Sequence, residues 1–258
     1  LRRLAVDLGQ HHVGDVAGEG AFALDRRQLA GIAEHQDRLA EAQQVARHLV
    51  ADLVPAGQRL PAFASISDVP APIDLAVVVV PAEAVEPALE AAAVHGVRAA
   101  IVFSSGFAEV GGAGREAQAR LTALAHRTGL RIVGPNCQGI AHLPTRLMTT
   151  FASGFLDEPL CIGPIAMVSQ SGAMAGMLYE LARTQGLGFN YWVSTGNEAD
   201  VQAADILAEV VADGETRVAC CYLEDVKDAE RFRGALARAH RHRVPVFVLK
   251  SGRSAQGQ

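Results

Sequence analysis

The sequence lacks three features that would each define a class of protein: an excess of positive charge, paired cysteines and a long apolar run. Its 258 residues hold 23 Lys and Arg against 28 Asp and Glu, a formal net charge of −5. This balance provides no basic field to neutralise the phosphates of a nucleic acid. No apolar stretch reaches the roughly 18 residues that a membrane span needs, and the first residues have no apolar signal-peptide core. We therefore expect neither a nucleic-acid nor a membrane partner.

Cysteine is scarce, and none of its positions forms a C-x-x-C pair. The four cysteines are Cys137, Cys161, Cys220 and Cys221. Such isolated cysteines are typical of reduced thiols in a cytosolic protein, so we expect a cytoplasmic location. The nine histidines show no metal-ligand spacing, and we expect no metal site.

From about residue 74 onward, short β-branched apolar runs alternate with Ala-rich segments of helical period. This alternation predicts an α/β fold with parallel sheets covered by helices. The predicted strands are 75–80, 99–103, 131–133, 165–169, 189–194, 218–223 and 246–249. The predicted helices are 83–95, 115–128, 172–185, 200–213 and 228–242.

Glycines and prolines interrupt this rhythm between residues 134 and 164, and they predict a boundary between two α/β domains. We place the domains at 65–145 and 160–258. Residues 1–64 show no clear strand; residues 4–8 followed by Gly9 are a poor version of the strand and Gly-rich turn that open a nucleotide-binding domain. We interpret 1–64 as an atypical or degraded N-terminal part of the first domain.

The sharpest local motif is residues 163–173, which read GPIAMVSQSGA. A buried strand here ends in small hydroxyl residues and a glycine, and a helix begins. Such a turn directs free backbone N–H groups, Ser hydroxyls and the positive end of a helix dipole to one point, which favours an anion. The alternative is that Ser171 only caps the helix, and the pattern alone leaves both open.

Other strand ends also carry polar groups. Residues 132–139 place Asn136 and Cys137 in a Gly-Pro turn, and Glu224 follows the strand 218–223 directly. Ligands of an open parallel sheet bind beyond the carboxyl ends of its strands, and a carboxylate there can fix an imidazole tautomer. An ordinary turn and a solvated or helix-capping carboxylate are the alternatives. The strand ends at 80–82 and 103–107 are either crevice-lining segments or plain βα loops.

Taken together and in this order, these motifs resemble the α subunit, or α-like half, of ADP-forming acetyl-CoA synthetases and of succinyl-CoA synthetase. The resemblance spans about residues 65–258 and is carried by six short words: 74–82, SSGF at 104–107, GPN at 134–136, VSQSGA at 168–173, STGNE at 194–198 and LKSGR at 249–253.

The resemblance implies a Rossmann-like CoA-binding domain followed by a flavodoxin-like, succinyl-CoA-synthetase-like domain. It implies an acid–CoA ligase that interconverts acyl-CoA, phosphate and a nucleoside diphosphate with acid, CoA and a nucleoside triphosphate through a phosphohistidine. The ligands would be CoA or acyl-CoA and phosphate. ATP or ADP and Mg would enter only through an ATP-grasp domain or β subunit.

The resemblance also assigns roles to residues. Glu224 matches the glutamate that orients the histidine. The remaining candidates are cofactor-binding: the helix start that stabilises the phosphohistidine, and residues that face CoA or the acyl-transfer centre. They are Ser169, Gln170, Ser171 and Gly172 for the helix start, and Pro81, Ser104, Ser105, Gly106, Asn136 and Cys137 for CoA.

Two departures from the family pattern set further expectations. Residues 1–64 have no convincing CoA-phosphate loop. In the family, the phosphorylated histidine follows the word at 249–253, whereas this sequence ends at Gln258. We therefore expect a fragment that cannot catalyse the full reaction alone. Two alternatives are a CoA-binding regulatory module of a protein lysine acetyltransferase and a degenerate, non-functional product.

Overall fold

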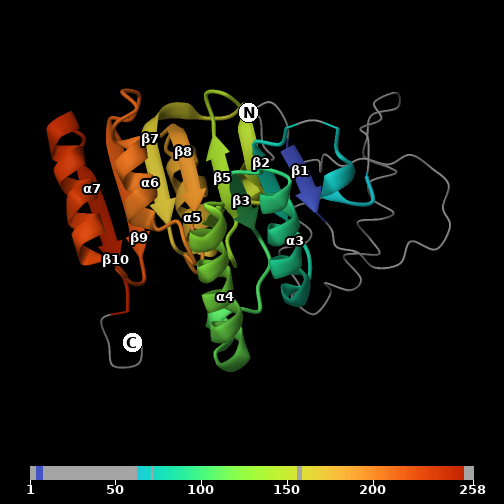
Figure 1. The fold of residues 1–258 in the computed structure, drawn as a ribbon. Coiled ribbons are helices and arrows are strands. Elements are labelled where there is room, and N and C mark those ends of the chain that lie inside the picture. The colour runs from blue at the N-terminus through green and yellow to red at the C-terminus, as the bar shows by residue number, and fades with distance from the viewer. Residues whose placement is uncertain (1–3, 8–62, 71, 156–158, 253–258) are drawn as a thin grey trace, which may run out of the picture.

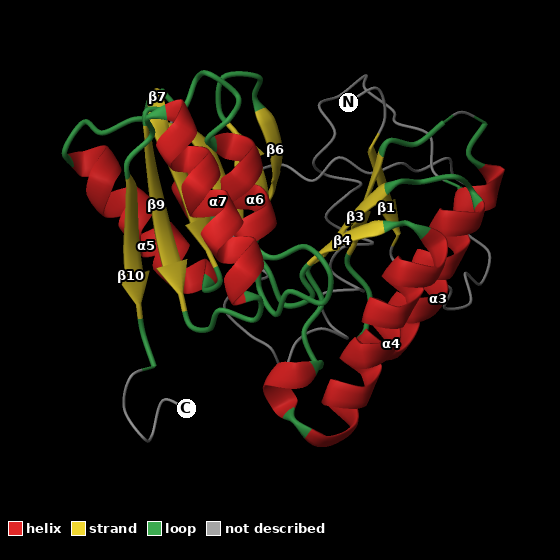
Figure 2. Ribbon diagram, turned by 60° about the vertical axis from the view of Figure 1, so that its left-hand side comes forward, coloured by secondary structure: helices red, strands yellow, loops and turns green. Residues whose placement is uncertain are grey.

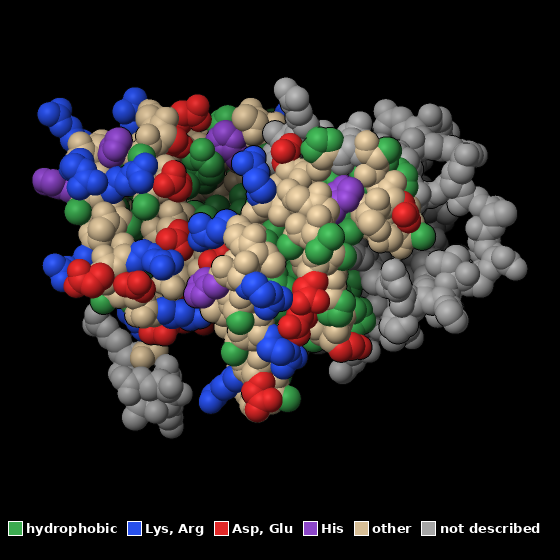
Figure 3. All heavy atoms as spheres, viewed as in Figure 1, with side chains coloured by type: hydrophobic (Ala, Val, Ile, Leu, Met, Phe, Trp, Pro, Cys, Tyr) green, Lys and Arg blue, Asp and Glu red, His purple; other side chains and the backbone are tan. Residues whose placement is uncertain are grey.

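The computed structural model describes residues 4–7, 63–70, 72–155 and 159–252, and these form two α/β units, each built on its own sheet (Figure 1). The strands and helices alternate along the chain as the sequence predicts. Among the described residues, no helix is both long and apolar enough to cross a membrane. On the face shown in Figure 3, Lys and Arg side chains are interspersed with Asp and Glu.

The first sheet has four parallel strands in the order β1-β2-β3-β4. They are β1 (Leu4–Asp7), β2 (Leu75–Val78), β3 (Ala99–Val102) and β4 (Arg131–Val133). Helices α3 (Ala82–Val94) and α4 (Gly112–Thr128) pack against one face. The apolar residues of β2 alternate between this helix-covered core and the opposite face, as the two-residue period of a strand requires. Short 3-10 turns lie at Ile66–Asp68 and Ala108–Val110.

Strand β1 corrects one expectation. The sequence analysis found no clear strand in residues 1–64, yet Leu4–Asp7 pairs in parallel with β2, with Leu4 opposite Leu75. The strand is short and, among the described residues, lies at the edge of its sheet, so its pattern is weak and pairing with a buried neighbour decides its conformation. The sequence also has an apolar stripe of helical period at 28–53, which predicts a helix, and these residues lie outside those that the structure describes.

The second sheet has six strands in the order β10-β9-β7-β8-β5-β6. Four are parallel: β7 (Ile162–Ser169), β8 (Phe189–Ser194), β9 (Val218–Leu223) and β10 (Val246–Lys250). Helix α5 (Gly172–Thr184) covers one face, and α6 (Ala203–Val210) and α7 (Ala229–His242) cover the other (Figure 2). The core under α5 is aromatic and includes the fully buried Trp192, whose Nε1 donates to the Ala175 carbonyl at 3.0 Å.

A hairpin lies where the sequence analysis placed only a boundary. Strands β5 (Gly139–His142) and β6 (Leu147–Thr150) pair antiparallel, and β5 also pairs antiparallel with β8. A Cβ at Gly139 would lie 2.0 Å from the Thr149 carbonyl oxygen, so glycine permits the close approach of the two strands. A strand of four residues interrupted by glycine has little periodicity of its own, and the second sheet supplies its partners.

Candidate functional site

The two sheets meet through the segment that follows β8. Its backbone runs beside β4, because Ala199 N donates to Gly134 O at 2.8 Å and Val201 N donates to Ile132 O at 3.0 Å. The Asp200 carboxylate accepts hydrogen bonds from the backbone N of Ile132 and from Arg131 Nε, both at 2.9 Å. The strand ends of the first sheet are therefore held beside the loop at 195–202 of the second unit.

The Gly-Pro turn after β4 contacts this loop directly. The Gly134–Pro135 peptide bond is cis, and Asn136 has a φ of 56°. Asn136 Nδ2 donates to Asn197 Oδ1 at 3.2 Å, and Asn197 N donates to Pro135 O at 2.9 Å. A Cβ at Gly196, whose φ is 60°, would lie 2.4 Å from the carbonyl oxygens of Pro135 and Asn136. Only glycine allows the loop to pack this closely against the turn.

Three predicted CoA-facing residues come together at the ends of β2 and β3. Pro81 is the N-cap residue of α3 and makes no side-chain capping bond, and a Cβ at Gly106 would lie 3.1 Å from Ala82 Cβ at the same helix start. Ser104 Oγ donates to Val80 O at 2.5 Å and accepts from Val80 N at 3.2 Å. The Ser104 hydroxyl thus ties the two strand ends together. The neighbouring Ser105 is half-buried.

Glu109 stabilises the loop after β3, and sequence reasoning did not select it as a site residue. Its carboxylate accepts from the backbone N–H groups of Gly106 and Phe107, at 2.5 and 3.1 Å, and from Asn197 Nδ2. Burial acts to raise the pKa of Glu109, but the hydrogen bonds from Asn197 and the backbone outweigh it, so the pKa lies below its ordinary value. Asn197 thereby joins the β3 loop to the second unit.

Cys137 lies inside the protein rather than in the crevice. It is 2% exposed, and its Sγ donates to Val102 O at 3.3 Å. Burial raises the pKa of this thiol to about 12, which keeps it protonated and unreactive at neutral pH. Its side chain packs in a buried apolar cluster with Leu75, Ile101 and Val133 of the first sheet.

The junction of β7 and α5 has the geometry of an anion site. Ser169 Oγ donates to Ser171 O at 2.7 Å, and Ser171 Oγ accepts from Met174 N at 3.3 Å, which makes Ser171 the N-cap of α5. The amides of Gly172 and Ala173, the first two helical residues, have no acceptor within the helix. Capping by Ser171 and an available helix N-terminus therefore coexist, and the partial positive charge at this end favours an anion.

The first unit reaches this helix start through Gln138. A Cβ at Gly172 would lie 2.5 Å from Gln138 Cγ, and Gln138 N donates to Ser194 Oγ at 3.1 Å. The turn after β4 and the start of α5 are therefore in contact, which brings strand ends of the two sheets next to each other.

Glu224 follows β9 and is exposed. Its backbone N–H donates to Gln170 Oε1 at 2.6 Å, and its carbonyl oxygen accepts from Lys250 Nζ at 2.7 Å. The neighbouring Ser251 N donates to Leu223 O at 2.9 Å. The backbone of Glu224 is thus held by residues from the ends of both adjacent strands, β7 and β10, while its carboxylate stays accessible.

Glu198 is a buried acid that sequence reasoning quoted in a motif but did not select. It is 5% exposed, and its carboxylate accepts from Thr195 Oγ1 at 2.8 Å, Ala203 N at 2.8 Å and Gln170 Nε2 at 3.0 Å. Burial raises the pKa of Glu198 above its ordinary value, although these hydrogen bonds and the nearby Lys227 oppose the shift. Its sequence signal was the letters STGNE; Thr195 and Ala203 lie within five residues of Glu198, whereas Gln170 lies 28 residues away.

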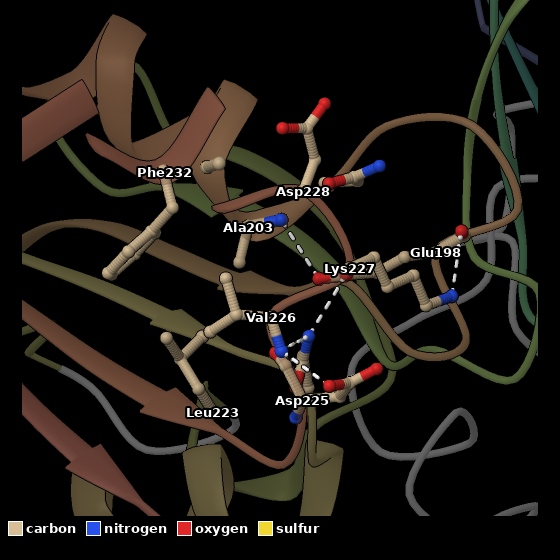
Figure 4. A pocket seen from close by; sticks show the side chains of 11 residues that line it. Glu198, Ala203, Leu223, Asp225, Val226, Lys227, Asp228 and Phe232 are labelled. Atoms are coloured by element: carbon tan, nitrogen blue, oxygen red, sulfur yellow. Dashed lines mark hydrogen bonds between the residues drawn. The ribbon is translucent and has the colours of Figure 1, made fainter. Parts of the chain in front are cut away.

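A small hollow of about 210 Å³, partly open to solvent, lies behind this network (Figure 4). Lys227 crosses it and donates to Glu198 O at 3.1 Å and to Asn197 O. Within the described part of the chain, no group of three or more His, Cys, Asp or Glu is placed to hold a metal ion. The hollow is bordered by polar and apolar side chains: Gln170, Glu198, Gln202, Ala203, Ala204, Leu223, Asp225, Val226, Lys227, Asp228 and Phe232.

The fold and the site together define an α/β protein of two sheet-based units, in which the N-terminus of α5 lies where the two units meet. Family models agree with this description. Residues 41–143 match a CoA-binding domain, and residues 162–258 match a succinyl-CoA ligase-like flavodoxin domain.

Several acid–CoA ligases are similar to most of this chain. Acetate–CoA ligase (ADP-forming) I subunit alpha of Pyrococcus furiosus is 36% identical over 201 residues, which cover 78% of this chain and 42% of that protein. The 4-hydroxybutyrate–CoA ligase (ADP-forming) of Nitrosopumilus maritimus is 38% identical over 197 residues, 76% of this chain and 28% of that protein. The chain thus spans less than half the length of these relatives.

A solved structure shows the same arrangement. The apo form of dinucleotide-forming acetyl-coenzyme A synthetase 1 from Ca. Korarchaeum cryptofilum superposes with a TM-score of 0.71 at 30% identity, over 87% of this chain and 50% of that one. That enzyme has also been solved in complex with phosphate and ADP. The chain belongs to the family of ADP-forming acyl-CoA ligase α subunits.

Proposed function

We propose that this chain is the CoA-binding and phosphoryl-handling portion of an acid–CoA ligase that forms a nucleoside diphosphate. The reaction interconverts acyl-CoA, phosphate and nucleoside diphosphate with acid, CoA and nucleoside triphosphate. The observation that carries the proposal is the contact between the two units, where the free N-terminus of α5 and the Glu224 turn border the strand ends of the CoA-binding domain.

The α5 start supplies the stabilisation that a phosphoryl group needs. The N–H groups of Gly172 and Ala173 and the helix dipole act on a dianionic group without any reorganisation of the protein. Glu224, exposed beside this helix start, accepts a hydrogen bond from the imidazole that carries the phosphoryl group and fixes its tautomer. Phosphate, acyl phosphate and phosphohistidine share the same anionic chemistry, so one cradle serves all three.

The strand ends of the first unit supply the CoA contacts. A ligand of a parallel sheet binds beyond the strand ends. This position is bordered by the uncapped start of α3 after Pro81, the half-buried Ser105 and the turn at Asn136. Ser104 and Gly106 shape this surface through their backbone. We propose a carboxylic acid as the acyl substrate, and an ATP-grasp domain or β subunit as the partner that provides ATP or ADP and Mg.

Calorimetric titration of the chain with CoA tests the binding half of the proposal. We expect saturable binding that Ser105→Tyr abolishes, because the larger side chain fills the strand-end crevice. Thr184→Tyr, at the exposed far end of α5, is the control and retains binding. Absence of heat at millimolar CoA with the unmodified chain contradicts CoA binding.

Acid- and CoA-dependent ADP formation by the complete enzyme tests the catalytic half. Glu224→Gln is expected to lower kcat about 10- to 100-fold, the usual effect of losing a residue that orients a catalytic imidazole. Glu230→Gln is the matched control, because Glu230 is 80% exposed on α7 and pairs only with Arg233. Equal activity of the two variants excludes the role proposed for Glu224.

A further inference from the structure

Gln170 lies in the middle of the anion-site motif, yet its side chain binds a different loop. Its Oε1 accepts from Glu224 N at 2.6 Å and from Asp225 N at 2.9 Å. Its Nε2 donates to Asp225 O at 2.9 Å and to Glu198 Oε2 at 3.0 Å. A Gln amide offers two acceptor sites and two donor hydrogens, so these bonds occupy its whole capacity. No donor or acceptor of the Gln170 amide therefore remains for a ligand.

The orientation of the amide is fixed by the chemistry of its partners. Both groups at Oε1 are backbone N–H donors, and both groups at Nε2 are oxygen acceptors. Rotating the amide by 180° would place donor against donor and acceptor against acceptor. The side chain therefore has a single arrangement, and it holds the turn after β9 in a single position relative to the start of α5.

The Gln170 side-chain amide also connects the turn after β9 to the loop at 195–202, which contacts the first unit. Glu198 adjoins Asn197, which contacts the Asn136 turn of the CoA-binding domain. Lys227, just beyond the turn, donates to the carbonyl oxygens of Glu198 and Asn197. Gln170 and Lys227 both connect the loop at 195–202 to the Glu224 turn. A displacement of this loop therefore also moves the turn.

We infer that Gln170 is a positioning residue: it holds the Glu224 turn against the start of α5 and couples it to the loop that contacts the CoA-binding domain. The inference rests on the proposed function for the role of Glu224. It differs from the sequence-based prediction, in which Gln170 is one of the cofactor-binding residues. Gln170 acts on the reaction only through the position of the Glu224 carboxylate.

The first test is hydrogen–deuterium exchange of the peptide covering residues 222–228 in Gln170→Met, which keeps the length of the side chain and removes its hydrogen bonds. We expect at least about tenfold faster exchange at the amides of Glu224 and Asp225, because each loses its acceptor. Helix α7 is the internal reference. Gln185→Met, an exposed glutamine at the other end of α5, is the matched control. Unchanged exchange in Gln170→Met overturns the inference.

The second test is steady-state kinetics of the complete ligase. Gln170→Met is expected to lower kcat about tenfold and leave the KM for CoA unchanged, because the CoA contacts lie on the other unit. In a Glu224→Gln background, Gln170→Met should add little further loss, since residues that act through one another are not additive. A multiplicative loss in the double variant means that Gln170 contacts substrate itself and overturns the inference.

The two tests distinguish a failure of the inference about Gln170 from a failure of the proposed function. If the unmodified enzyme forms no ADP from acid, CoA and ATP, the proposed function fails. The exchange measurement needs no activity and still decides whether Gln170 holds the turn.

Discussion

Buried polar residues determine how the loops of the site are held. Thr195 and Ser194 are fully buried at the end of β8, and Glu198 lies beside them with its carboxylate bound by three donors. A buried carboxylate is stable only when its hydrogen-bonding capacity is used, because desolvation disfavours the charged form. The raised pKa of Glu198 shows that the burial outweighs the bonds.

This raised pKa predicts a pH dependence of stability. The folded chain binds the Glu198 proton more tightly than the unfolded chain, where the ordinary value is 4.5. The stabilising contribution is therefore fully present below about 4.5 and is lost as the pH rises through the folded pKa. Urea unfolding midpoints across this range should fall with pH more steeply for the unmodified chain than for Glu198→Gln. Glu116→Gln, on the exposed face of α4, should follow the unmodified chain, and parallel curves for all three contradict the prediction.

The β7–α5 junction combines a helix cap with backbone amides that remain available at the helix start. Residues 163–173 predicted a strand that runs into a helix, and β7 and α5 meet there as expected. The choice between a helix cap and an anion site has no single answer, because Ser171 caps the amide of Met174 and leaves those of Gly172 and Ala173 available.

Substitution of Ser171 measures how much the helix cap contributes to stability. Ser171→Ala should lower the free energy of unfolding by about 1 kcal/mol, within the range of about 0.5–2 kcal/mol for a lost N-cap. Ser171→Asn should restore most of it, since Asn is an equally good cap. Urea unfolding measures both. An alanine variant as stable as the unmodified chain shows that the bond to Met174 contributes nothing.

At the scale of the whole molecule, the loop at 195–202 connects the two sheets. Its backbone bonds to Ile132, Gly134 and Pro135 continue along the edge of β4, and Thr122 Oγ1 donates to Ala199 O at 2.7 Å. The two units therefore share a hydrogen-bonded boundary, at which strand ends of both sheets lie close together.

Gly196 is the closest point of this boundary. Gly196→Ala should destabilise the chain by more than the roughly 1–3 kcal/mol of backbone strain at a positive φ, because its Cβ would also lie 2.4 Å from two carbonyl oxygens. Exchange at the Asn197 and Ala199 amides should accelerate. Gly214→Ala is the control, with a φ of 83° and open space around the added Cβ. Equal effects of the two substitutions on exchange at the boundary contradict the close-contact argument.

The sequence by itself determined the alternating α/β order and most strand and helix positions. These features are predictable because the spacing of apolar residues and the turn residues act on the local backbone. The predicted strands at 131–133, 189–194 and 218–223 agree with the structure. The β5–β6 hairpin and β1 escaped prediction, since short strands take their conformation from neighbours in the sheet. Strand β1 pairs with β2, and β5 pairs with β8 as well as with β6, so β1 and β5 each pair with a segment far away in the chain.

Only the tertiary structure decided what each motif side chain does. The Ser104 hydroxyl bonds to Val80, the Cys137 thiol is buried under Val102, and the Gln170 amide binds the turn at Glu224 and Asp225. These partners lie 24, 35 and 54 residues away in the sequence, and no local pattern encodes a hydrogen bond over such a separation. The motif at 163–173 predicted the junction of a strand and a helix, and packing between distant loops decided that the Gln170 amide binds the turn after β9.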